Sequence, residues 1–443
     1  MRSAALLLSA CTGPTVPASD SNAPTTDTAP ITDSATEPSA GDTSVETVSG
    51  DWTRPEYDPE ALPEDVVTLN IEIAPAAMAR LDADPWGADD ERGIFVDEDG
   101  VRHEVDLNYR GAYALSNVMS YGLRNWKVKL DSGDSYLERR EWNLNYEPHF
   151  RQKLAYDLFR FAGVAVPGAA HVILTLNGEQ QGLYLRYEDP DDGAWLQEQF
   201  GSTEGELYKA AYDLPGEPQC FALLTWLGDQ EADYQCHYAR KSGEADQEFA
   251  QLIGFLDDLN HLPDDDLADW AEDAVDVERL LSAMAVSNFI AQWDSYPQRP
   301  KNYWLYADPR SDAMVYIPWD LDAAFNPYTD STYNQMGATT SVLYNLLQSD
   351  YTPVHHIEGT DRPLVRRLLA IPAVQAAYLD RYTELSETIL SADYLQDRLD
   401  SLTTLVLPHI SSTDRARLEG YNDTTRAFIT TRAASVAAEL SEQ

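Results

Sequence analysis

The stretch S-N-F-I-A-Q-W-D-S-Y-P-Q-R-P-K-N-Y-W-L-Y-A-D-P-R-S-D-A-M-V-Y-I-P-W-D-L-D-A-A-F, from Ser287 to Phe325, carries the most chemical information in the sequence. Apolar residues at helical spacing end near Trp293 and predict the end of an amphipathic helix. Two short apolar runs follow, at 303–306 and 314–317, and predict a β-hairpin. Four oxygen-bearing side chains flank these elements: Asp294 and Asn302 before the hairpin, and Asp320 and Asp322 after it.

These side chains are suited to bind divalent cations. A carboxylate and an amide eight residues apart on one loop, with a carboxylate at the end of the next hairpin, can meet at hard cations through oxygen ligands. Phosphoryl transfer needs such metals around the phosphates and a carboxylate near the attacking hydroxyl. The order of helix, Asp, Asn, hairpin and Asp is also the order found in protein kinases. A purely structural reading stays open, in which W-D-L-D is a turn and Asp294 only ends a helix.

The pattern of the chain predicts an α+β protein of two lobes. Period-two alternation begins at Val66–Ile73, and turn signals at Asp97–Gly100 and Asn177–Gly178 predict hairpins. After about residue 190 the helical period dominates. Helices are predicted at 76–83, 150–162, 247–262, 275–293, 361–369, 373–390, 394–410 and 413–440. The strand-rich lobe should therefore span 61–190 and the helical lobe 191–443.

One predicted strand carries two lysines on the same face. In N-W-K-V-K-L-D, from Asn125 to Asp131, the apolar residues Trp126, Val128 and Leu130 alternate with Lys127 and Lys129. Such lysines are consistent with an ordinary solvated strand edge. They are equally consistent with a cleft in which they hold phosphate oxygens, as the strand lysine of kinases does.

Together these pieces resemble the spore coat protein H family of atypical kinases, the CotH kinases. The resemblance spans about residues 66 to 330, in the family's order. Its pieces are Y-R-G (109–111), W-K-V-K-L-D (126–131), N-L-N-Y (143–146), R-Q-K-L-A-Y-D-L-F (151–159), L-N-G-E-Q-Q-G-L-Y (176–184) through Glu188, L-Y-K (207–209), K-N-Y-W-L-Y (301–306) and I-P-W-D-L-D-A-A-F (317–325). The resemblance implies a protein-kinase-like fold, ATP with Mg or Mn, and transfer of the γ-phosphate to Ser or Thr of exported or surface proteins.

The resemblance also implies a role for each site residue. Asp294 would be the catalytic carboxylate, and Asn302 and Asp320 would be the metal ligands, with Asp322 as the second choice. Lys129 or Lys127 would be the phosphate-binding lysine, and Arg110 would lie near the phosphates. The backbone around Tyr187 and Glu188 would lie near the adenine.

Three features depart from ordinary kinases, one of them the loop between Asp294 and Asn302, which holds two prolines and is longer than the gap in ordinary kinases. No G-x-G-x-x-G precedes the lysine strand, and the helix at 150–162 has no glutamate to pair with the lysine, which leaves Asp157 as a shorter substitute. These departures keep open a catalytically inactive, kinase-like surface lipoprotein that binds a protein or glycan partner. A metal-dependent hydrolase is a third reading, but it lacks a histidine cluster, since His355 and His356 lie far along the chain.

Composition and the amino terminus indicate where the protein acts. The formal net charge is −44, from 31 basic and 75 acidic residues, which argues against nucleic acid as a partner. Residues 1–11 have the form of a bacterial lipoprotein signal ending at Cys11, which would take the lipid, and residues 12–60 should form a disordered tether. The expected location is therefore the bacterial cell envelope. Cys220 and Cys236 remain as an even pair, either a disulfide formed in an oxidising compartment or two buried thiols.

Overall fold

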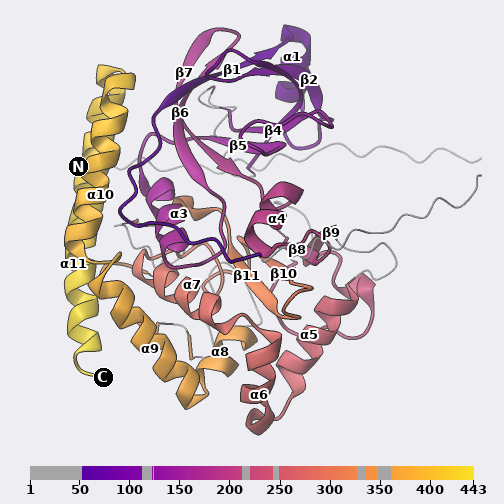
Figure 1. The fold of residues 1–443 in the computed structure, drawn as a ribbon, viewed down its shortest axis with the longest axis vertical. Helices are drawn as coiled ribbons and strands as arrows, with labels where there is room; N and C mark the ends of the chain where they lie inside the picture. Colours follow the sequence, from indigo (N-terminus) through magenta and orange to yellow (C-terminus); the bar gives the residue numbers. More distant parts are fainter. Residues whose placement is uncertain are drawn as a thin grey trace, which may run out of the picture. The chain divides into compact units, whose positions relative to one another are not determined.

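The computed structural model describes residues 52–111, 122, 124–211, 220–242, 249–326, 336–344, 346–347 and 361–443. The predicted signal segment and its lipidated Cys11 lie outside these residues, and so do His355 and His356. Residues 52–443 belong to one compact unit. In it, a barrel of strands comes first and a helical part built around a second sheet follows (Figure 1).

Seven strands close the barrel. They are β1 (Val67–Ile73), β2 (Glu91–Val96), β3 (Arg102–Tyr109), β4 (Trp126–Leu130), β5 (Glu141–Tyr146), β6 (Ala169–Leu176) and β7 (Glu179–Glu188). Their order is β1-β2-β3-β4-β5-β7-β6, and the parallel pairing of β1 with β6 closes the ring, with Leu69 opposite Leu174. Apolar side chains such as Phe95 and Val128 fill the barrel. The predicted α+β class is confirmed. The closure of the strands into a barrel was not predicted from the sequence.

The turns form where the sequence predicted them. Asn177 and Gly178 both have positive φ, 51° and 83°, which is the conformation that a two-residue turn between β6 and β7 requires. In the β2–β3 turn, the Asp97 carboxylate accepts hydrogen bonds from the Asp99 and Val101 amides at 3.0 and 2.8 Å. The short polar side chain thus replaces strand partners inside the turn.

The helical part surrounds a second sheet of order β11-β10-β8-β9. Its strands are β8 (Glu206–Ala210), β9 (Tyr238–Ser242), β10 (Tyr303–Ala307) and β11 (Met314–Pro318). The described helices are α1 (Pro75–Ala83), α3 (Arg151–Phe161), α4 (Gly193–Phe200), α5 (Ala250–His261), α6 (Asp264–Ala274), α7 (Val277–Phe289), α8 (Pro363–Leu369), α9 (Pro372–Glu387), α10 (Ala392–Val406) and α11 (Ser412–Leu440), with 3-10 turns η1 (Glu231–Asp233), η2 (Leu321–Ala323) and η3 (Leu407–His409). α4, α6 and β9 were not predicted. The predicted helix to Trp293 ends earlier, at Phe289, because Ala291 adopts a positive φ of 52°.

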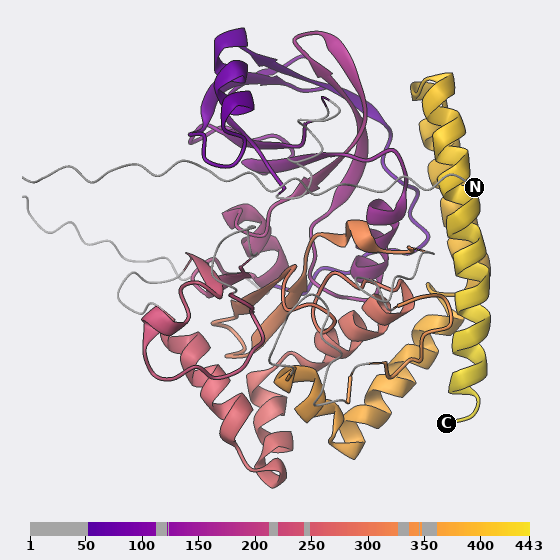
Figure 2. The same ribbon diagram turned by 180° about the vertical axis from the view of Figure 1, so that it is seen from behind.

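Helix α11 joins the barrel to the helical part, and Figures 1 and 2 show it running beside both. Near its start, Arg417 Nη1 donates a hydrogen bond to the Tyr146 hydroxyl of β5 at 2.9 Å. Near its end, the fully buried Arg432 donates to the carbonyl oxygens of Asn288 and Phe289 at 3.1 and 3.2 Å. This arginine donates to carbonyl groups at the C-terminal end of α7, where the last carbonyl groups of a helix find no hydrogen-bond donor within the helix itself. It thereby fixes the point from which the Asp294 loop begins.

The folded unit begins earlier than the sequence reading expected. Trp52 Nε1 donates to the Glu198 carbonyl at 2.9 Å, and Arg54 Nη2 lies 3.0 Å from Asp276 Oδ2. The Arg160 guanidinium lies 3.9 Å from the ring centroid of Tyr57. The prediction of a disordered tether from 12 to 60 is therefore wrong for residues 52–60. Aromatic and arginine side chains there give enough contact area to offset the chain entropy.

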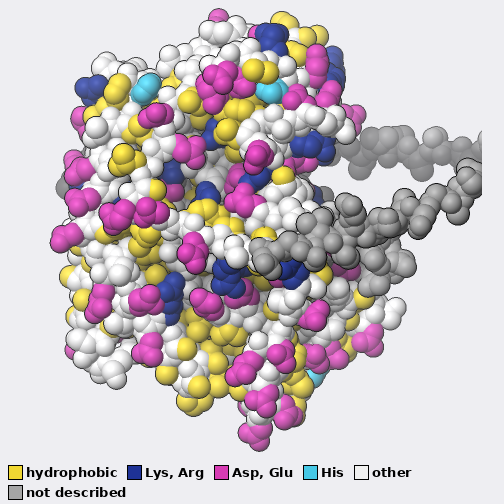
Figure 3. Space-filling view, viewed as in Figure 1, with side chains coloured by type: hydrophobic (Ala, Val, Ile, Leu, Met, Phe, Trp, Pro, Cys, Tyr) yellow, Lys and Arg dark blue, Asp and Glu magenta, His cyan; other side chains and the backbone are white. Residues whose placement is uncertain are grey.

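Acidic side chains are spread over the face seen in Figure 3, among apolar and neutral ones. This distribution fits a solvated surface of high negative charge. Within the described ranges, no helix combines the length and apolar character needed to cross a bilayer.

His171 on β6 makes the barrel sensitive to acid. The residue is 2% exposed, and burial lowers its pKa to about 4 from the usual 6.5, against the opposing influence of Glu147. The unfolded chain therefore takes up a proton on this histidine between pH 6.5 and pH 4, whereas the folded chain does not. Stability must fall as the pH falls through this window.

We expect His171→Leu to remove that part of the acid sensitivity. Between pH 7 and pH 4 the variant should lose about 3 kcal/mol less unfolding free energy than the wild type, because its unfolded state no longer gains this proton. Urea denaturation at the two pH values measures the difference. Equal losses in the two proteins would show that His171 titrates normally in the folded state.

Candidate active site

Asp294 lies in the loop that joins α7 to β10, between two cations. Arg299 Nη1 is 3.1 Å from its Oδ1, and Lys301 Nζ is 2.9 Å from its Oδ2. Asn302 Nδ2 donates to the Asp294 carbonyl at 2.7 Å and to its Oδ2 at 3.2 Å. Burial raises the pKa of Asp294, while Lys301 and Arg299 oppose the rise. The carboxylate is thus shielded, oriented and able to accept a proton.

Asn302 and Asp320 meet at the open end of the β10–β11 hairpin. The Trp319 amide donates to the Asn302 carbonyl at 3.1 Å, which holds the two ends together. Both residues have left-handed backbone, with φ of 57° for Asn302 and 53° for Asp320. Asn and Asp adopt this conformation more readily than other residues with side chains. The side chain of Gln292 supports the turn by donating to the Asp320 carbonyl at 2.9 Å.

Asp322 adds a third carboxyl group to this place. Its pKa is raised well above the usual value, first by desolvation and then by the charges of Asp320 and Asp294. The side chain of Asp322 is exposed to solvent. Three acids that repel one another are stabilised by a cation placed among them.

The three carboxylates do not form one tight cluster of ligand atoms. Among the described residues, only Cys220, Cys236 and His237 bring three Cys, His, Asp or Glu ligand atoms within 4.8 Å of one another, so the three acids form no such closed cage. Asn302 Nδ2 is used on Asp294, which leaves its Oδ1 to act as a ligand. The amide of Asn302 with the carboxylates of Asp320 and Asp322 fits Mg or Mn, which prefer hard oxygen ligands and keep open positions.

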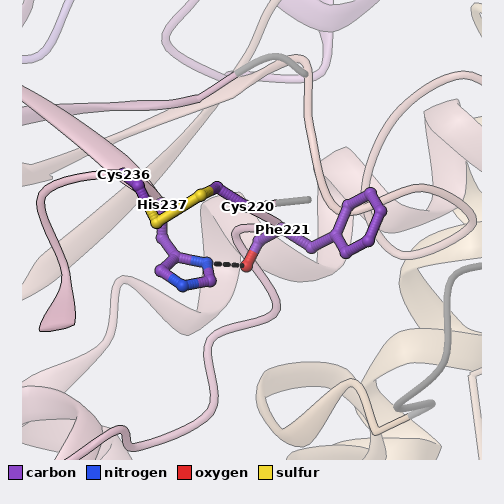
Figure 4. Close-up of a disulfide and its surroundings, with 4 residues drawn as sticks. All are labelled: Cys220, Phe221, Cys236 and His237. Atoms are coloured by element: carbon purple, nitrogen blue, oxygen red, sulfur yellow. Dashed lines mark hydrogen bonds between the residues drawn. A yellow bond between two sulfur atoms is a disulfide. The ribbon is translucent and has the colours of Figure 1, made fainter. Parts of the chain in front are cut away.

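The cysteine cluster has a structural role. Cys220 and Cys236 form the predicted disulfide, with Cα atoms 5.5 Å apart, so that their sulfurs are not available to a metal (Figure 4). His237 Nδ1 is hydrogen-bonded to the Phe221 carbonyl at 2.7 Å. The bridged segment lies against the Asp294 loop, because the Ala222 amide donates to the Pro300 carbonyl at 3.2 Å. The disulfide therefore helps to hold that loop.

Lys127 and Lys129 share one face of β4, as predicted, opposite a buried apolar face. Lys127 Nζ lies 2.7 Å from Asp189 Oδ2 and 2.6 Å from Glu141 Oε2, and Lys129 Nζ lies 2.8 Å from Glu141 Oε1. Burial works against the charge of Lys127, but Asp189 and Glu141 outweigh it and raise its pKa. Lys127 is the less exposed of the two, 31% against 45%, and has the more defined position.

Asp157 is not the partner of the strand lysine, which corrects the sequence reading. Its carboxylate contacts Lys153 one turn earlier and Arg398 Nη2 at 3.0 Å. Glu141 takes the role instead, because it lies directly opposite Lys129 in the β4–β5 register. An acid on the neighbouring strand thus replaces an acid on a helix.

Arg110 and Glu188 differ in their relation to the site. The Arg110 guanidinium lies 5.0 Å from the ring centroid of Tyr187 and 5.6 Å from that of Trp319, the neighbour of Asp320. Glu188 turns elsewhere: its carboxylate lies 2.9 Å from Arg139 Nε and accepts from the Gly168 amide at 2.6 Å. The structure brings Arg110 to the aromatic wall of the site and keeps the Glu188 carboxylate out of it.

Two residues of the site were missed from the sequence. Asp189 follows Glu188 in the exit E-D-P-D-D, where five residues include four acids and nothing marks one of them. Lys209 on β8 belongs to the L-Y-K segment, to which the sequence assigned no role, and its Nζ lies 4.8 and 5.3 Å from the ring centroids of Trp304 and Trp319. The scarcity of lysine, six in the chain, was the available signal for Lys209.

Comparison with known proteins identifies the family of this chain. Inner spore coat protein H of Bacillus subtilis (strain 168) is 24% identical over 258 residues, which cover 57% of this chain and 67% of that protein. One chain in a structure of HipA, HipB and operator DNA from Shewanella oneidensis MR-1 aligns with 82% of this chain, over 80% of its own length and at 12% sequence identity. The TM-score of that alignment, 0.33, is too low to support an argument. The family model described as CotH kinase protein matches residues 107–434, which extends the predicted resemblance into α11. The chain belongs to the CotH kinase family.

Proposed function

We propose that this chain is an exported, ATP-dependent protein kinase that transfers the γ-phosphate to Ser or Thr of surface or envelope proteins. The observation that carries the proposal is the meeting of Asp294, Asn302 and Asp320 at the open end of one hairpin, in a member of the CotH kinase family. In this proposal the barrel and the helical part act as the two lobes of a protein-kinase-like fold.

The residues of the Asp294 loop and of the open end of the β10–β11 hairpin serve the chemical step. The attacking hydroxyl oxygen forms a bond to the γ-phosphorus, the bond from that phosphorus to the β–γ bridging oxygen breaks, and Asp294 receives the hydroxyl proton. Lys301, 2.9 Å from Asp294, offsets negative charge beside it. Asn302, Asp320 and Asp322 hold Mg or Mn, and the bound ion supplies positive charge to the phosphate oxygens.

The barrel contributes cations for the phosphates. Lys127 is oriented by Asp189 and Glu141 from two sides, so little side-chain entropy remains to be lost when an anion binds. Arg110 is oriented by the Tyr187 and Trp319 rings and donates to Asn145 Oδ1 at 2.6 Å. Preoriented charges of this kind stabilise developing negative charge more than mobile ones do.

We also propose that the protein works outside the cytoplasm, attached to the envelope by a lipid on Cys11. The bond between Cys220 and Cys236 supports this, since oxidising compartments favour disulfides. Its partners in the proposal are exported or surface proteins. The formal charge of −44 argues against nucleic acid.

The proposal is tested with the full chain and ATP carrying a labelled γ-phosphate, with casein as a generic acceptor and the chain itself as a second one. We expect label on Ser or Thr in the presence of Mg or Mn and none in excess EDTA. ATP binding with metal but without transfer to any acceptor would instead favour a kinase-like binding protein. A chain that neither binds ATP nor transfers label would overturn the proposal.

A further inference from the structure

Ala222, two residues after Cys220, contacts the chain on both sides of Asn302. Its amide donates to the Pro300 carbonyl at 3.2 Å, and its carbonyl accepts a hydrogen bond from the Tyr303 hydroxyl at 2.6 Å. Ala222 and Tyr303 are both 0% exposed, so water has little access to these bonds. The position of the backbone around Asn302 therefore depends on the position of Ala222.

Asn302 needs support of this kind. Its φ of 57° lies in the left-handed region, which a residue with a side chain occupies at a cost unless its surroundings hold it there. Its Nδ2 donates to the Asp294 carbonyl at 2.7 Å, which leaves Oδ1 as the atom available to a metal. A shift of the Asn302 backbone therefore moves that oxygen directly.

Three links tie the Cys220 segment, defined as residues 220–224, to β9 and to the turn before it. One is the disulfide (Figure 4). The second is the hydrogen bond between His237 Nδ1 and the Phe221 carbonyl, at 2.7 Å. The third runs from the Leu224 amide to the Tyr238 hydroxyl, at 3.1 Å. Since β9 pairs with β8, these links join the Cys220 segment to the second sheet.

A reductant in solution reaches the disulfide at Cys236. Cys236 is exposed, whereas Cys220 is only 8% exposed. Thiol–disulfide exchange needs access to one of the two sulfurs, so attack is directed to the exposed residue. After reduction, two hydrogen bonds remain of the three links between the Cys220 segment and β9. Hydrogen bonds open far more readily than a covalent bond, so Ala222 is then held less firmly.

We propose that the Cys220–Cys236 disulfide is a redox switch for the metal site: the bond holds Asn302 in place for the ion, and reduction by a dithiol releases it. The inference rests on the proposed function, which makes Asn302 a metal ligand. The dithiol gives two electrons and two protons, so the S–S bond breaks, two cysteine thiols form, and the dithiol becomes a disulfide. Asp320 keeps its support in the reduced chain, because Gln292 donates to its carbonyl at 2.9 Å.

The test measures Mn affinity by titration calorimetry on the full chain in both redox states. The chain is reduced with dithiothreitol, freed of it under nitrogen, and checked for the thiols gained. We expect the reduced chain to bind Mn about tenfold more weakly, the lower end of the effect of losing a group that orients a metal ligand, because Asp320 and Asp322 remain. Transfer of labelled γ-phosphate should fall at least as far, and reoxidation should restore both quantities.

Tyr303→Phe tests the route of the effect. It removes one of the two hydrogen bonds through which Ala222 acts, so the response of the Mn affinity to reduction should shrink from about tenfold to about threefold. Tyr306→Phe is the matched control, because its hydroxyl, on the same strand β10, donates to the Ser202 carbonyl at 2.9 Å instead. The Tyr306→Phe variant should keep the full response.

Equal Mn affinity of the oxidised and the reduced wild type would overturn the switch, and this comparison needs no variant to fold. Loss of the far-ultraviolet circular dichroism on reduction would also overturn it, because the disulfide would then hold the whole fold rather than Asn302. The same response in Tyr303→Phe and Tyr306→Phe would show that the disulfide does not act through Ala222. An oxidised wild type that binds neither Mn nor ATP would overturn the proposed function, and the switch with it.

Discussion

Asp294→Asn is expected to lower the rate of phosphoryl transfer by about 10²- to 10⁴-fold, the range for loss of a general base. The substitution keeps the size of the side chain and an oxygen for the Asn302 amide, but it removes the group that takes the hydroxyl proton. Affinity for ATP should stay within about twofold, because Asp294 faces Arg299 and Lys301 rather than the barrel cations. Transfer of labelled γ-phosphate and calorimetric ATP binding measure the two quantities.

Asp312→Asn is the control for this experiment. Asp312 is an exposed acid of the same β10–β11 hairpin with φ of 57°, a conformation that Asn adopts as readily as Asp. It should transfer phosphate at the wild-type rate. Transfer by Asp294→Asn at a similar rate would remove Asp294 from the chemistry.

Asp320→Asn is expected to lower the affinity for Mn by more than about 100-fold. Loss of a residue that only hydrogen-bonds to a metal ligand already lowers metal affinity by about 10- to 100-fold, and Asp320 would contact the metal directly. Without metal, the variant should be at least as stable as the wild type, because one of three mutually repelling charges is gone. With Mn at about 100 times the wild-type Kd, only the wild type should gain about 2.7 kcal/mol of stability. Denaturant titrations with Mn and with EDTA measure both effects.

The same substitution also lowers the pKa of Asp322, because the charge of Asp320 is one cause that raises it. Asp322 alone cannot replace the missing carboxylate, since Asn302 supplies only a neutral oxygen. An equal gain from Mn in the variant and the wild type would show that the metal binds elsewhere.

The sequence predicted the features that local chemistry specifies. Asn177–Gly178 formed its turn because both positions need positive φ, and the alternation around Lys127 placed that lysine on one face because a strand has a period of two. Cys220 and Cys236 paired because no other described cysteine competes. The positions of Asp294 and Asp320 around the hairpin followed from its two apolar runs.

The missed features depend on contacts distant in sequence. The pairing of β1 with β6 closes the barrel across about a hundred residues, and no local signal marks it. Helix α6, D-D-D-L-A-D-W-A-E-D-A, buries only Leu267 and Ala271, so few apolar residues mark its buried face. Asp189 acquires its role only when Lys127 arrives from another strand.

The most direct test of the account is a crystal structure of the full chain grown with Mn and a non-hydrolysable ATP analogue, read through the anomalous signal of Mn. We expect an anomalous peak within bonding distance of the Asp320 carboxylate and the Asn302 Oδ1, with the γ-phosphate between that ion and Asp294. An ion bound elsewhere, or a nucleotide that leaves Asp294 and Asp320 both without contact, would contradict the kinase interpretation.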